Sequence, residues 1–269
     1  LTPYNYQILF TLGMLLSLPF VTRRCKKADV NIKGVVLSVS ASLLVLIGNI
    51  FVYKSFMLGG QASVVLPYTN LYPLVTILIA LLVFKEKLYL INIIGIIIVI
   101  PAIVMLSGQS QVFYHPVQFF KALDVKSWLL FASLSLLLFG IFSASQKLTS
   151  RYLSAEWSYV TFILAAVLIS VCFIIFKLVD FNFSLKTFWV GASAGLFDGL
   201  GVLFIYGAYR SYGKAAQVSS IVSSVQQVFT ICLALVFLKE QLTLIEFIGI
   251  AMAIAGSWLI LKERKKEAS

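Results

Sequence analysis

The chain alternates between long apolar stretches and short polar connections, and this pattern predicts membrane-spanning helices. Nine nearly charge-free stretches recur, close to the ~20 residues that a helix needs to cross a bilayer. They are Tyr6–Val21, Val35–Phe56, Ala62–Phe84, Leu88–Leu106, Trp128–Gln146, Tyr159–Phe176, Trp189–Tyr209, Ala215–Leu238 and Leu242–Leu261. Because most connections are only a few residues long, neighbouring helices are expected to pack as antiparallel hairpins.

One connection is much longer, between Ser107 and Ser127, and it contains the single histidine of the chain, His115. Aromatic and valine residues on both sides of Pro116 predict a segment that lies at the membrane interface. His115 is expected to be a solvated loop residue rather than a ligand.

Composition supports an all-α integral membrane protein. Hydrophobic residues make up 61% of the 269-residue chain, charged residues make up 12%, and the mean hydropathy is +1.01. A soluble domain of this size has too little interior to hide so much apolar surface. The three cysteines form no disulfide framework, because Cys172 and Cys232 fall inside apolar stretches and Cys25 lies in a basic connection. No cofactor is predicted.

Two long segments of the sequence repeat each other, residues 48–106 and residues 201–261. In the first part of the repeat, Gly48, Phe51, Tyr53, Gly60, Ala62 and Val65 match Gly201, Phe204, Tyr206, Gly213, Ala215 and Val218. After one inserted residue, Thr76, Ile77, Ala80, Leu81, Lys85, Glu86, Leu88, Ile94 and Gly95 match Thr230, Ile231, Ala234, Leu235, Lys239, Glu240, Leu242, Ile248 and Gly249. Chance similarity between apolar segments does not also align turn glycines, a Lys-Glu pair and a tyrosine, so the match indicates an internal repeat.

The second repeat has five predicted helices, whereas the first has four. The segment Leu1–Pro3, before the first helix, resembles Leu153–Ala155, before the sixth. The counterpart of the Trp128 helix is therefore expected upstream of Leu1, in a parent with ten helices; a native nine-helix protein is the alternative. An odd number of helices per repeat reverses the direction of equivalent helices, so the repeats are expected to be inverted about a pseudo-twofold axis in the membrane plane.

The predicted organisation is a first repeat at residues 1–107, an inter-repeat loop at 108–126, a second repeat at 127–262 and a basic cytoplasmic tail at 263–269. The net charge of +11 is spread over short loops, which suits a membrane protein rather than a nucleic-acid-binding protein. With the Arg23–Lys27 loop inside and the sides alternating, fifteen basic residues lie inside and six outside. The inside set is Arg23, Arg24, Lys26, Lys27, Lys33, Lys85, Lys87, Lys147, Arg151, Arg210, Lys214, Lys262, Arg264, Lys265 and Lys266, and the outside set is Lys54, Lys121, Lys126, Lys177, Lys186 and Lys239. This asymmetry predicts a cytoplasmic C-terminus, and the compact loops suggest a bacterial cytoplasmic membrane.

The doubled Gly-x-Ala turn, Lys-Glu-x-Leu turn and Ile-Gly-Ile pattern, in residues 60–96 and 213–250, resemble the EamA type of the drug/metabolite transporter superfamily. The resemblance covers the whole chain apart from the expected first helix. It implies a ten-helix carrier of small metabolites, including amino acids, often working as an exporter, with inverted five-helix halves around a central cavity. Members often carry a proline in the helix after each Gly-x-Ala turn, whereas here Pro67 and Pro73 occur in the first repeat alone.

Asp198 is the sharpest single candidate for transport chemistry. It lies near the middle of the Trp189–Tyr209 stretch, where a carboxylate costs roughly 2.5–3.5 kcal/mol on insertion scales. It is therefore expected to face a cavity or a partner. In a functional role, Asp198 is a proton-coupling site or the counter-charge for a substrate amine. In a structural role, it is a protonated or hydrogen-bonded Asp.

Polar side chains in the other predicted helices are candidates for a substrate cavity. Pro67 and Pro73 flank Tyr68 and Asn70 and remove backbone donors, which can free carbonyls toward a cavity. On the eighth helix, one face carries Ser219, Ser223 and Gln226 and another carries Ser220, Ser224 and Gln227. One of these faces is expected to line the pathway and the other to pack against a helix. The full set of candidate cavity residues is Asn49, Tyr53, Tyr68, Asn70, Gln146, Tyr206, Ser223, Gln226 and Gln227.

Two doubled features have simpler explanations. Tyr53 and Tyr206 occupy matched repeat positions, which fits either paired gates or tyrosines that anchor the protein at the membrane interface, and we favour anchors. In the Lys-Glu turns, Glu86 and Glu240 are expected to cap the helix that follows, since a helix N-terminus favours negative charge.

The leading hypothesis is a secondary transporter, expected to export small polar metabolites such as amino acids by alternating access, with proton coupling through Asp198 as an option. The alternative is a nucleotide-sugar or phosphorylated-sugar antiporter, but such a substrate needs intramembrane Lys or Arg, and Lys54 and Arg210 lie at helix ends. An enzyme is disfavoured because the sequence has no His-rich site, Gly-x-Ser-x-Gly motif or intramembrane carboxylate pair. A channel is disfavoured because one Asp does not form a ring of charge. The expected partners are a small-molecule substrate and the lipid bilayer but not nucleic acid, and a homodimer is a candidate assembly.

Overall fold

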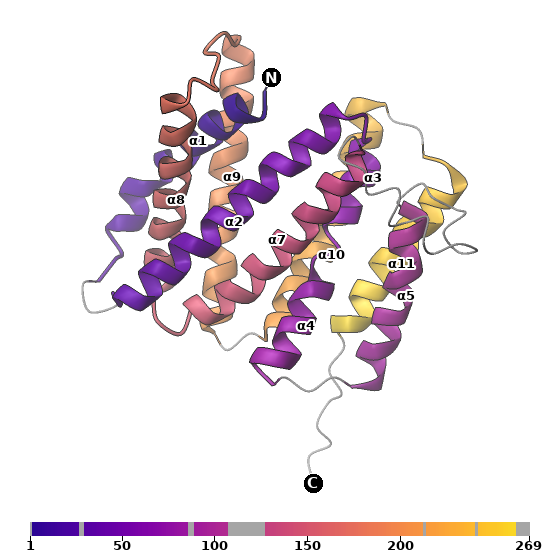
Figure 1. Cartoon of the computed structure of the whole chain (residues 1–269). Helices are drawn as coiled ribbons and strands as arrows, with labels where there is room; N and C mark the ends of the chain where they lie inside the picture. The colour runs from indigo at the N-terminus through magenta and orange to yellow at the C-terminus, as the bar shows by residue number, and fades with distance from the viewer. Residues whose placement is uncertain are drawn as a thin grey trace. The chain divides into compact units, whose positions relative to one another are not determined.

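A computed structural model describes residues 2–26, 30–85, 89–106, 127–211, 214–239 and 242–261. These residues form helices joined by short turns (Figure 1). The helices are α1 (Pro3–Thr22), α2 (Ile32–Met57), α3 (Ala62–Thr69), α4 (Pro73–Val83), α5 (Leu90–Leu106), α7 (Trp128–Thr149), α8 (Ala155–Ile175), α9 (Leu185–Arg210), α10 (Ala215–Leu233), the π-helix η3 (Ala234–Leu238) and α11 (Leu244–Leu261). The predicted inter-repeat loop at 108–126, with His115, and the basic tail at 263–269 lie outside the described residues.

Every apolar stretch predicted from the sequence is helical in the structure. Within the described residues, six helices or helix pairs are long and apolar enough to cross a membrane: Pro3–Thr22, Ile32–Met57, Ala62–Val83, Trp128–Thr149, Ala155–Ile175 and Leu185–Arg210. The three other stretches contain shorter apolar helices. Large apolar side chains point outward from many helices; Leu82, for example, is 80% exposed. An all-helical integral membrane protein accounts for this surface, because lipid covers it.

Three helices begin earlier than their apolar stretches do, because polar residues cap them. The Thr2, Ser154 and Ser184 hydroxyls each accept a hydrogen bond from the backbone N–H three residues ahead, at 3.2 Å in each case. Such N-caps satisfy donors that the first turn leaves unpaired. The predicted starts at Tyr6, Tyr159 and Trp189 were therefore three to four residues late.

The predicted third span is broken between α3 and α4, at Asn70–Tyr72. In this break the N–H groups of Leu71 and Tyr72 donate to carbonyls three residues back, at 3.2 and 3.1 Å, instead of four. Pro73 begins α4 and has no N–H to continue the α-helical pattern. The predicted single span is therefore two helices, and the break lies directly before Pro73, whereas Pro67 lies inside α3.

The chain forms two compact units. Unit 1 comprises residues 1–50 and 144–213, and unit 2 comprises residues 51–143 and 214–269. Each unit combines segments from both sides of the long central connection, and the divisions fall inside α2 and α7.

In unit 1, α1 packs against α8 and α9, and α8 also contacts α9 (Figure 1). Glycines allow α1 and α9 to meet backbone to backbone. A Cβ atom on Gly195 would overlap the Phe10 carbonyl, and one on Gly13 would overlap the Ala192 carbonyl. Small residues are common where helices approach closely in membranes, because they bring the backbones into van der Waals contact.

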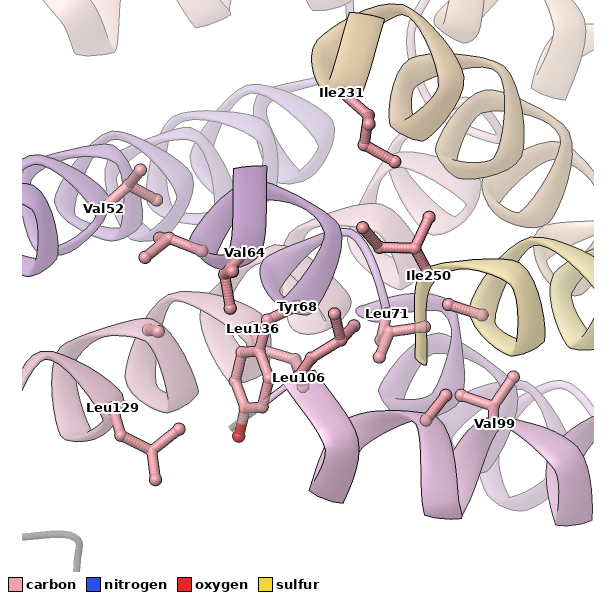
Figure 2. Close-up of a cluster of buried hydrophobic side chains, with 14 of the residues drawn as sticks. Val52, Val64, Tyr68, Leu71, Val99, Leu106, Leu129, Leu136, Ile231 and Ile250 are labelled. Carbon is pink, nitrogen blue, oxygen red and sulfur yellow. The ribbon is translucent and has the colours of Figure 1, made fainter. Parts of the chain in front are cut away.

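In unit 2, α11 packs along α5, while α10 contacts α3, α4 and α11. Buried apolar side chains from these helices and from α7 form one core. Figure 2 shows part of it, with Tyr68 from α3, Val99 and Leu106 from α5 and Ile250 from α11. Gly256 on α11 lies so close to α5 that a Cβ there would be 2.5 Å from the Val99 Cγ2 atom.

Candidate functional site

A cluster of polar side chains lies inside unit 1, around the hydroxyl of Tyr206 on α9. Tyr206 is only 1% exposed, and its hydroxyl lies near side chains from two other helices, although none of them has hydrogen-bond geometry to it: Ser38 and Ser42 of α2 and Gln146 of α7. Gln146 is 3% exposed. Two of the predicted cavity residues, Gln146 and Tyr206, are therefore brought together by the fold although 60 positions separate them.

The two serines of this cluster form hydrogen bonds with groups other than Tyr206 and Gln146. Ser38 shares a 2.6 Å hydrogen bond with Thr161 of α8, and the Ser42 hydroxyl donates to the Ser38 carbonyl at 2.6 Å. The Tyr206 hydroxyl and the Gln146 amide nitrogen have no partner of hydrogen-bond geometry in the part of the chain that the structure describes. A buried polar group without a partner costs about 1–3 kcal/mol, so these two groups are well placed to bind a polar ligand.

A second polar group of unit 1 surrounds Tyr159 on α8. The Tyr159 side chain is fully buried, and its hydroxyl lies 2.8 Å from the Ser17 hydroxyl of α1. Since Ser17 donates its own proton to the Met14 carbonyl at 2.7 Å, Tyr159 is the donor in the pair. Gly199 makes room for this tyrosine, because a Cβ at that position would overlap the Tyr159 hydroxyl.

Asp198 lies beside this group, near the middle of α9. Its carboxylate interacts electrostatically with the Tyr159 hydroxyl; its side chain has an accessible surface, although many protein atoms surround the carboxyl group. Among the described residues no hydrogen bond or ion pair to the carboxylate occurs. The choice between a coupling carboxylate and a structural one stays a prediction.

The remaining candidates of unit 1 and α2 are less buried. Asn49 and Tyr53 are half-buried on α2, and the Tyr53 ring packs edge-on against Phe56 with centroids 6.0 Å apart. An interface anchor needs a ring that reaches the headgroup region, and this role stays a prediction for Tyr53. The near-complete burial of Tyr206 does not fit the anchor role that we favoured for it.

The candidates of unit 2 are not brought into one observed cluster. Tyr68 is part of the apolar core, and its hydroxyl is 2.8 Å from the Ser133 hydroxyl, so its placement is explained by packing. Asn70 is buried at the α3–α4 break, and its amide nitrogen has no hydrogen-bond partner in the described residues. Ser223 is buried and Gln226 is exposed, while the side chain of Gln227 lies outside the described part.

The lysines of the two Lys-Glu turns have the same φ angle. Lys85 and Lys239 both adopt the left-handed region at φ 54°. The capping role predicted for Glu86 and Glu240 lies outside the described residues. Thr243 and Glu246 cap the helix that follows the second turn, since the Glu246 carboxylate accepts from the Thr243 N–H at 2.7 Å and the Thr243 hydroxyl accepts from the Glu246 N–H at 3.3 Å.

Several polar residues of unit 1 were not predicted as site residues. They are Ser17, Ser38, Ser42, Tyr159 and Thr161. The sequence carried a weak signal for one pair, because Ser38 and Ser42 are four residues apart and therefore share a helix face. The partners of that face come from positions more than 100 residues away, and the sequence does not reveal them.

Three comparisons place the chain among known proteins. The model of the EamA-like transporter family matches residues 6–108 and 126–262. An uncharacterized protein of Methanocaldococcus jannaschii is 27% identical over 104 residues, which make up 39% of this chain and 75% of that protein. One solved crystal structure matches with a TM-score of 0.67 and 16% identity, over 97% of this chain and 88% of the other, and this likeness concerns the fold alone.

Proposed function

Because this chain belongs to the EamA-like transporter family, we propose that it is a secondary transporter that exports small polar metabolites such as amino acids. The observation that carries the proposal is the buried cluster around Tyr206 and Gln146. Its side chains are uncharged, and two of its hydrogen-bonding groups have no partner among the described residues. Such a site suits a small ligand with hydroxyl, amide or amino-acid groups.

A phosphorylated substrate is a poorer match. Arg210 is the basic residue of α9 nearest to the cluster in sequence, and its guanidinium donates to the Leu153 carbonyl at 2.7 Å. This bond assigns Arg210 to the connection between α7 and α8. Lys54 is exposed near the end of α2. A sugar phosphate or nucleotide requires a charged partner in its site, and the Tyr206 cluster contains none.

We propose that the two repeats are inverted, as alternating access requires. Contacts at repeat-equivalent positions support this arrangement. Leu9 of α1 meets Gly191 of α9, where a Cβ on the glycine would lie 2.7 Å from the Leu9 Cβ atom. Thr161 lies 152 residues after Leu9, and Gly191 lies 153 residues after Ser38; these are the offsets that align the repeats. Thr161 and Ser38 share a hydrogen bond between α8 and α2. The same contact thus occurs twice with the repeats exchanged.

The helix caps support the same reading. The Asn92 side chain accepts from the Tyr89 N–H at 2.9 Å, and the Glu246 side chain accepts from the Thr243 N–H at 2.7 Å. Asn92 and Glu246 are 154 residues apart, and so are Tyr89 and Thr243; this is the offset that aligns the Lys-Glu turns. The relative from Methanocaldococcus jannaschii is about half as long as this chain, since the same 104 residues are 75% of one and 39% of the other. A protein of that length corresponds to one repeat.

Proton coupling through Asp198 and the membrane orientation are further parts of the proposal. Asp198 is an exposed carboxylate within a membrane-spanning helix, beside the Tyr159–Ser17 hydrogen bond, and an intramembrane carboxylate that faces a water-filled path can exchange a proton. The distribution of basic residues supports a cytoplasmic C-terminus in a bacterial membrane. A homodimer is a proposed assembly as well.

Counterflow in proteoliposomes tests the proposal. We would measure uptake of a pooled set of labelled amino acids by the purified protein, with and without a pH gradient. Exchange that falls at least tenfold in Gln146→Leu, but not in Gln7→Leu, is the expected result. Gln7 is the matched control because it is as deeply buried in unit 1, at 1% exposure, while its amide donates to Thr11 at 3.3 Å.

Two other outcomes would change the conclusion. Equal losses in the two glutamine variants would mean that transport depends on burial of the amides and not on the Tyr206 cluster. If Asp198→Asn transports normally and still depends on the pH gradient, Asp198 is not the coupling residue, and the proposal for the substrate site is unaffected.

A further inference from the structure

Unit 1 contains a cavity of about 740 Å³, and none of the residues of the Tyr206 cluster lines it. It is formed by the last turn of α1, the first turn of α8 and one face of the second half of α9. Its walls are mainly apolar, and its charged residues are Arg23, Arg24 and Glu156. A cavity with an apolar wall and a basic rim fits a ligand with an apolar body and an anionic head.

The apolar wall is open to the surroundings of the protein. Phe20 and Phe204 both line the cavity, and they are 70% and 74% exposed. Both belong to helices that are long and apolar enough to span a membrane, so lipid chains are the surroundings of these rings. At Gly207 the wall has room to spare, because a Cβ there would meet no atom within 4 Å.

The basic rim has unused binding capacity. Arg23 and Arg24 are exposed directly after α1 ends at Thr22, and in the described part of the chain neither guanidinium forms a hydrogen bond or ion pair. Glu156 is half-buried in the first turn of α8, where the helix N-terminus favours its negative charge. Two arginines and one glutamate leave the rim with a positive charge.

We propose that this cavity binds an anionic phospholipid, with the phosphate at Arg23 and Arg24 and an acyl chain along Phe20, Phe204 and Gly207. Guanidinium groups bind phosphate oxygens through paired, charge-assisted hydrogen bonds. Basic pockets at the ends of membrane helices recognise anionic headgroups for the same reason. The site lies beyond the proposed transport function, because it includes none of the residues assigned to the substrate or to coupling.

Lipid binding to the purified protein in detergent tests the proposal. We would titrate phosphatidylglycerol and, separately, phosphatidylcholine with the same acyl chains, and follow bound lipid by native mass spectrometry and the Tm by thermal unfolding. Wild-type protein should retain phosphatidylglycerol in preference to phosphatidylcholine and gain a higher Tm from it. Arg23→Gln and Arg24→Gln should each weaken phosphatidylglycerol binding about fivefold.

Two matched controls separate the cavity from general surface effects. Lys26→Gln removes one charge from the same segment without lining the cavity and should leave binding within about twofold of wild type. Gly207→Leu fills the apolar wall and should abolish the preference, whereas Gly201→Leu should not. Gly201 is on the same helix but does not line the cavity, and a Cβ added there would also meet no atom within 4 Å. The two glycine-to-leucine substitutions raise helix propensity equally, so they differ only in whether they fill the cavity.

Three results would overturn the proposal. One is wild-type binding that does not distinguish the two lipids. Another is a loss in Lys26→Gln equal to that in the arginine variants, or unchanged binding in Gly207→Leu. The third is equal binding of soluble glycerol phosphate, which would make the cavity a site for small anions. Transport activity is not the readout, so failure here leaves the proposed function untouched.

Discussion

Replacing Tyr206 by Phe should stabilise the protein, whereas the same substitution at Tyr159 should destabilise it. Both tyrosines are almost completely buried in unit 1, at 1% and 0% exposure. The Tyr159 hydroxyl is 2.8 Å from the Ser17 hydroxyl, while the Tyr206 hydroxyl has no partner of hydrogen-bond geometry in the described residues. The two substitutions therefore remove the same atom from a satisfied and from an unsatisfied site.

The expected magnitudes follow from this difference. Removing an unsatisfied buried hydroxyl relieves a desolvation cost of about 1–3 kcal/mol, and removing a bonded one loses about 0.5–1.5 kcal/mol. The two variants should thus differ by about 2–4 kcal/mol in unfolding free energy. At roughly 2–4 °C for each kcal/mol, their Tm values should be separated by about 4–16 °C, with wild type between them.

Thermal unfolding in a mild detergent measures the effect, with each variant purified and scanned under the same conditions and without added substrate. A Tyr206→Phe variant that loses as much stability as Tyr159→Phe would refute the reasoning. Its hydroxyl would then be satisfied in the folded protein, and the argument that this group is available for a substrate would fail as well.

Other predictions concern packing and transport. Gly195→Leu should prevent correct assembly of unit 1, because the side chain overlaps the Phe10 backbone, while Gly201→Leu should give normal yield and monodispersity in size-exclusion chromatography. Ser38→Ala and Thr161→Val should each lower the Tm, and a double-mutant cycle should show a coupling of about 0.5–1.5 kcal/mol; additive effects would mean that their 2.6 Å hydrogen bond contributes nothing. Asp198→Asn should abolish uptake driven by a pH gradient while preserving exchange at equal pH, and full pH-driven uptake in this variant would contradict a coupling role.

Much of the fold could be predicted because lipid imposes a simple rule on sequence. A segment that crosses a membrane must be apolar over its length and must satisfy its backbone internally, so each apolar stretch predicts a helix. The break after Thr69 was not predicted, because Ala62–Phe84 is one continuous apolar stretch; Pro73, which has no N–H for the helical pattern, begins the second helix. The helix starts at Pro3, Ala155 and Leu185 were missed because capping residues are polar and do not belong to an apolar stretch.

The candidate site was only partly predictable. Asp198, Gln146 and Tyr206 could be selected, because a polar residue deep in an apolar stretch is costly and requires a reason. Tyr68 was selected for the same reason, but its ring belongs to the core and its hydroxyl meets Ser133. Polarity and depth do not distinguish a side chain that pairs within the protein from one that remains available.

The sequence by itself determined the membrane class, the helical segments and the internal repeat, because these depend on local composition and on similarity along the chain. Tertiary structure decided which polar groups satisfy one another. Ser38 finds Thr161 across 123 positions and Ser17 finds Tyr159 across 142, while Tyr206 and Gln146 meet without either donor being matched. Hydrogen bonds act over about 3 Å, so these pairings depend on the rotation and spacing of packed helices, which no local pattern specifies.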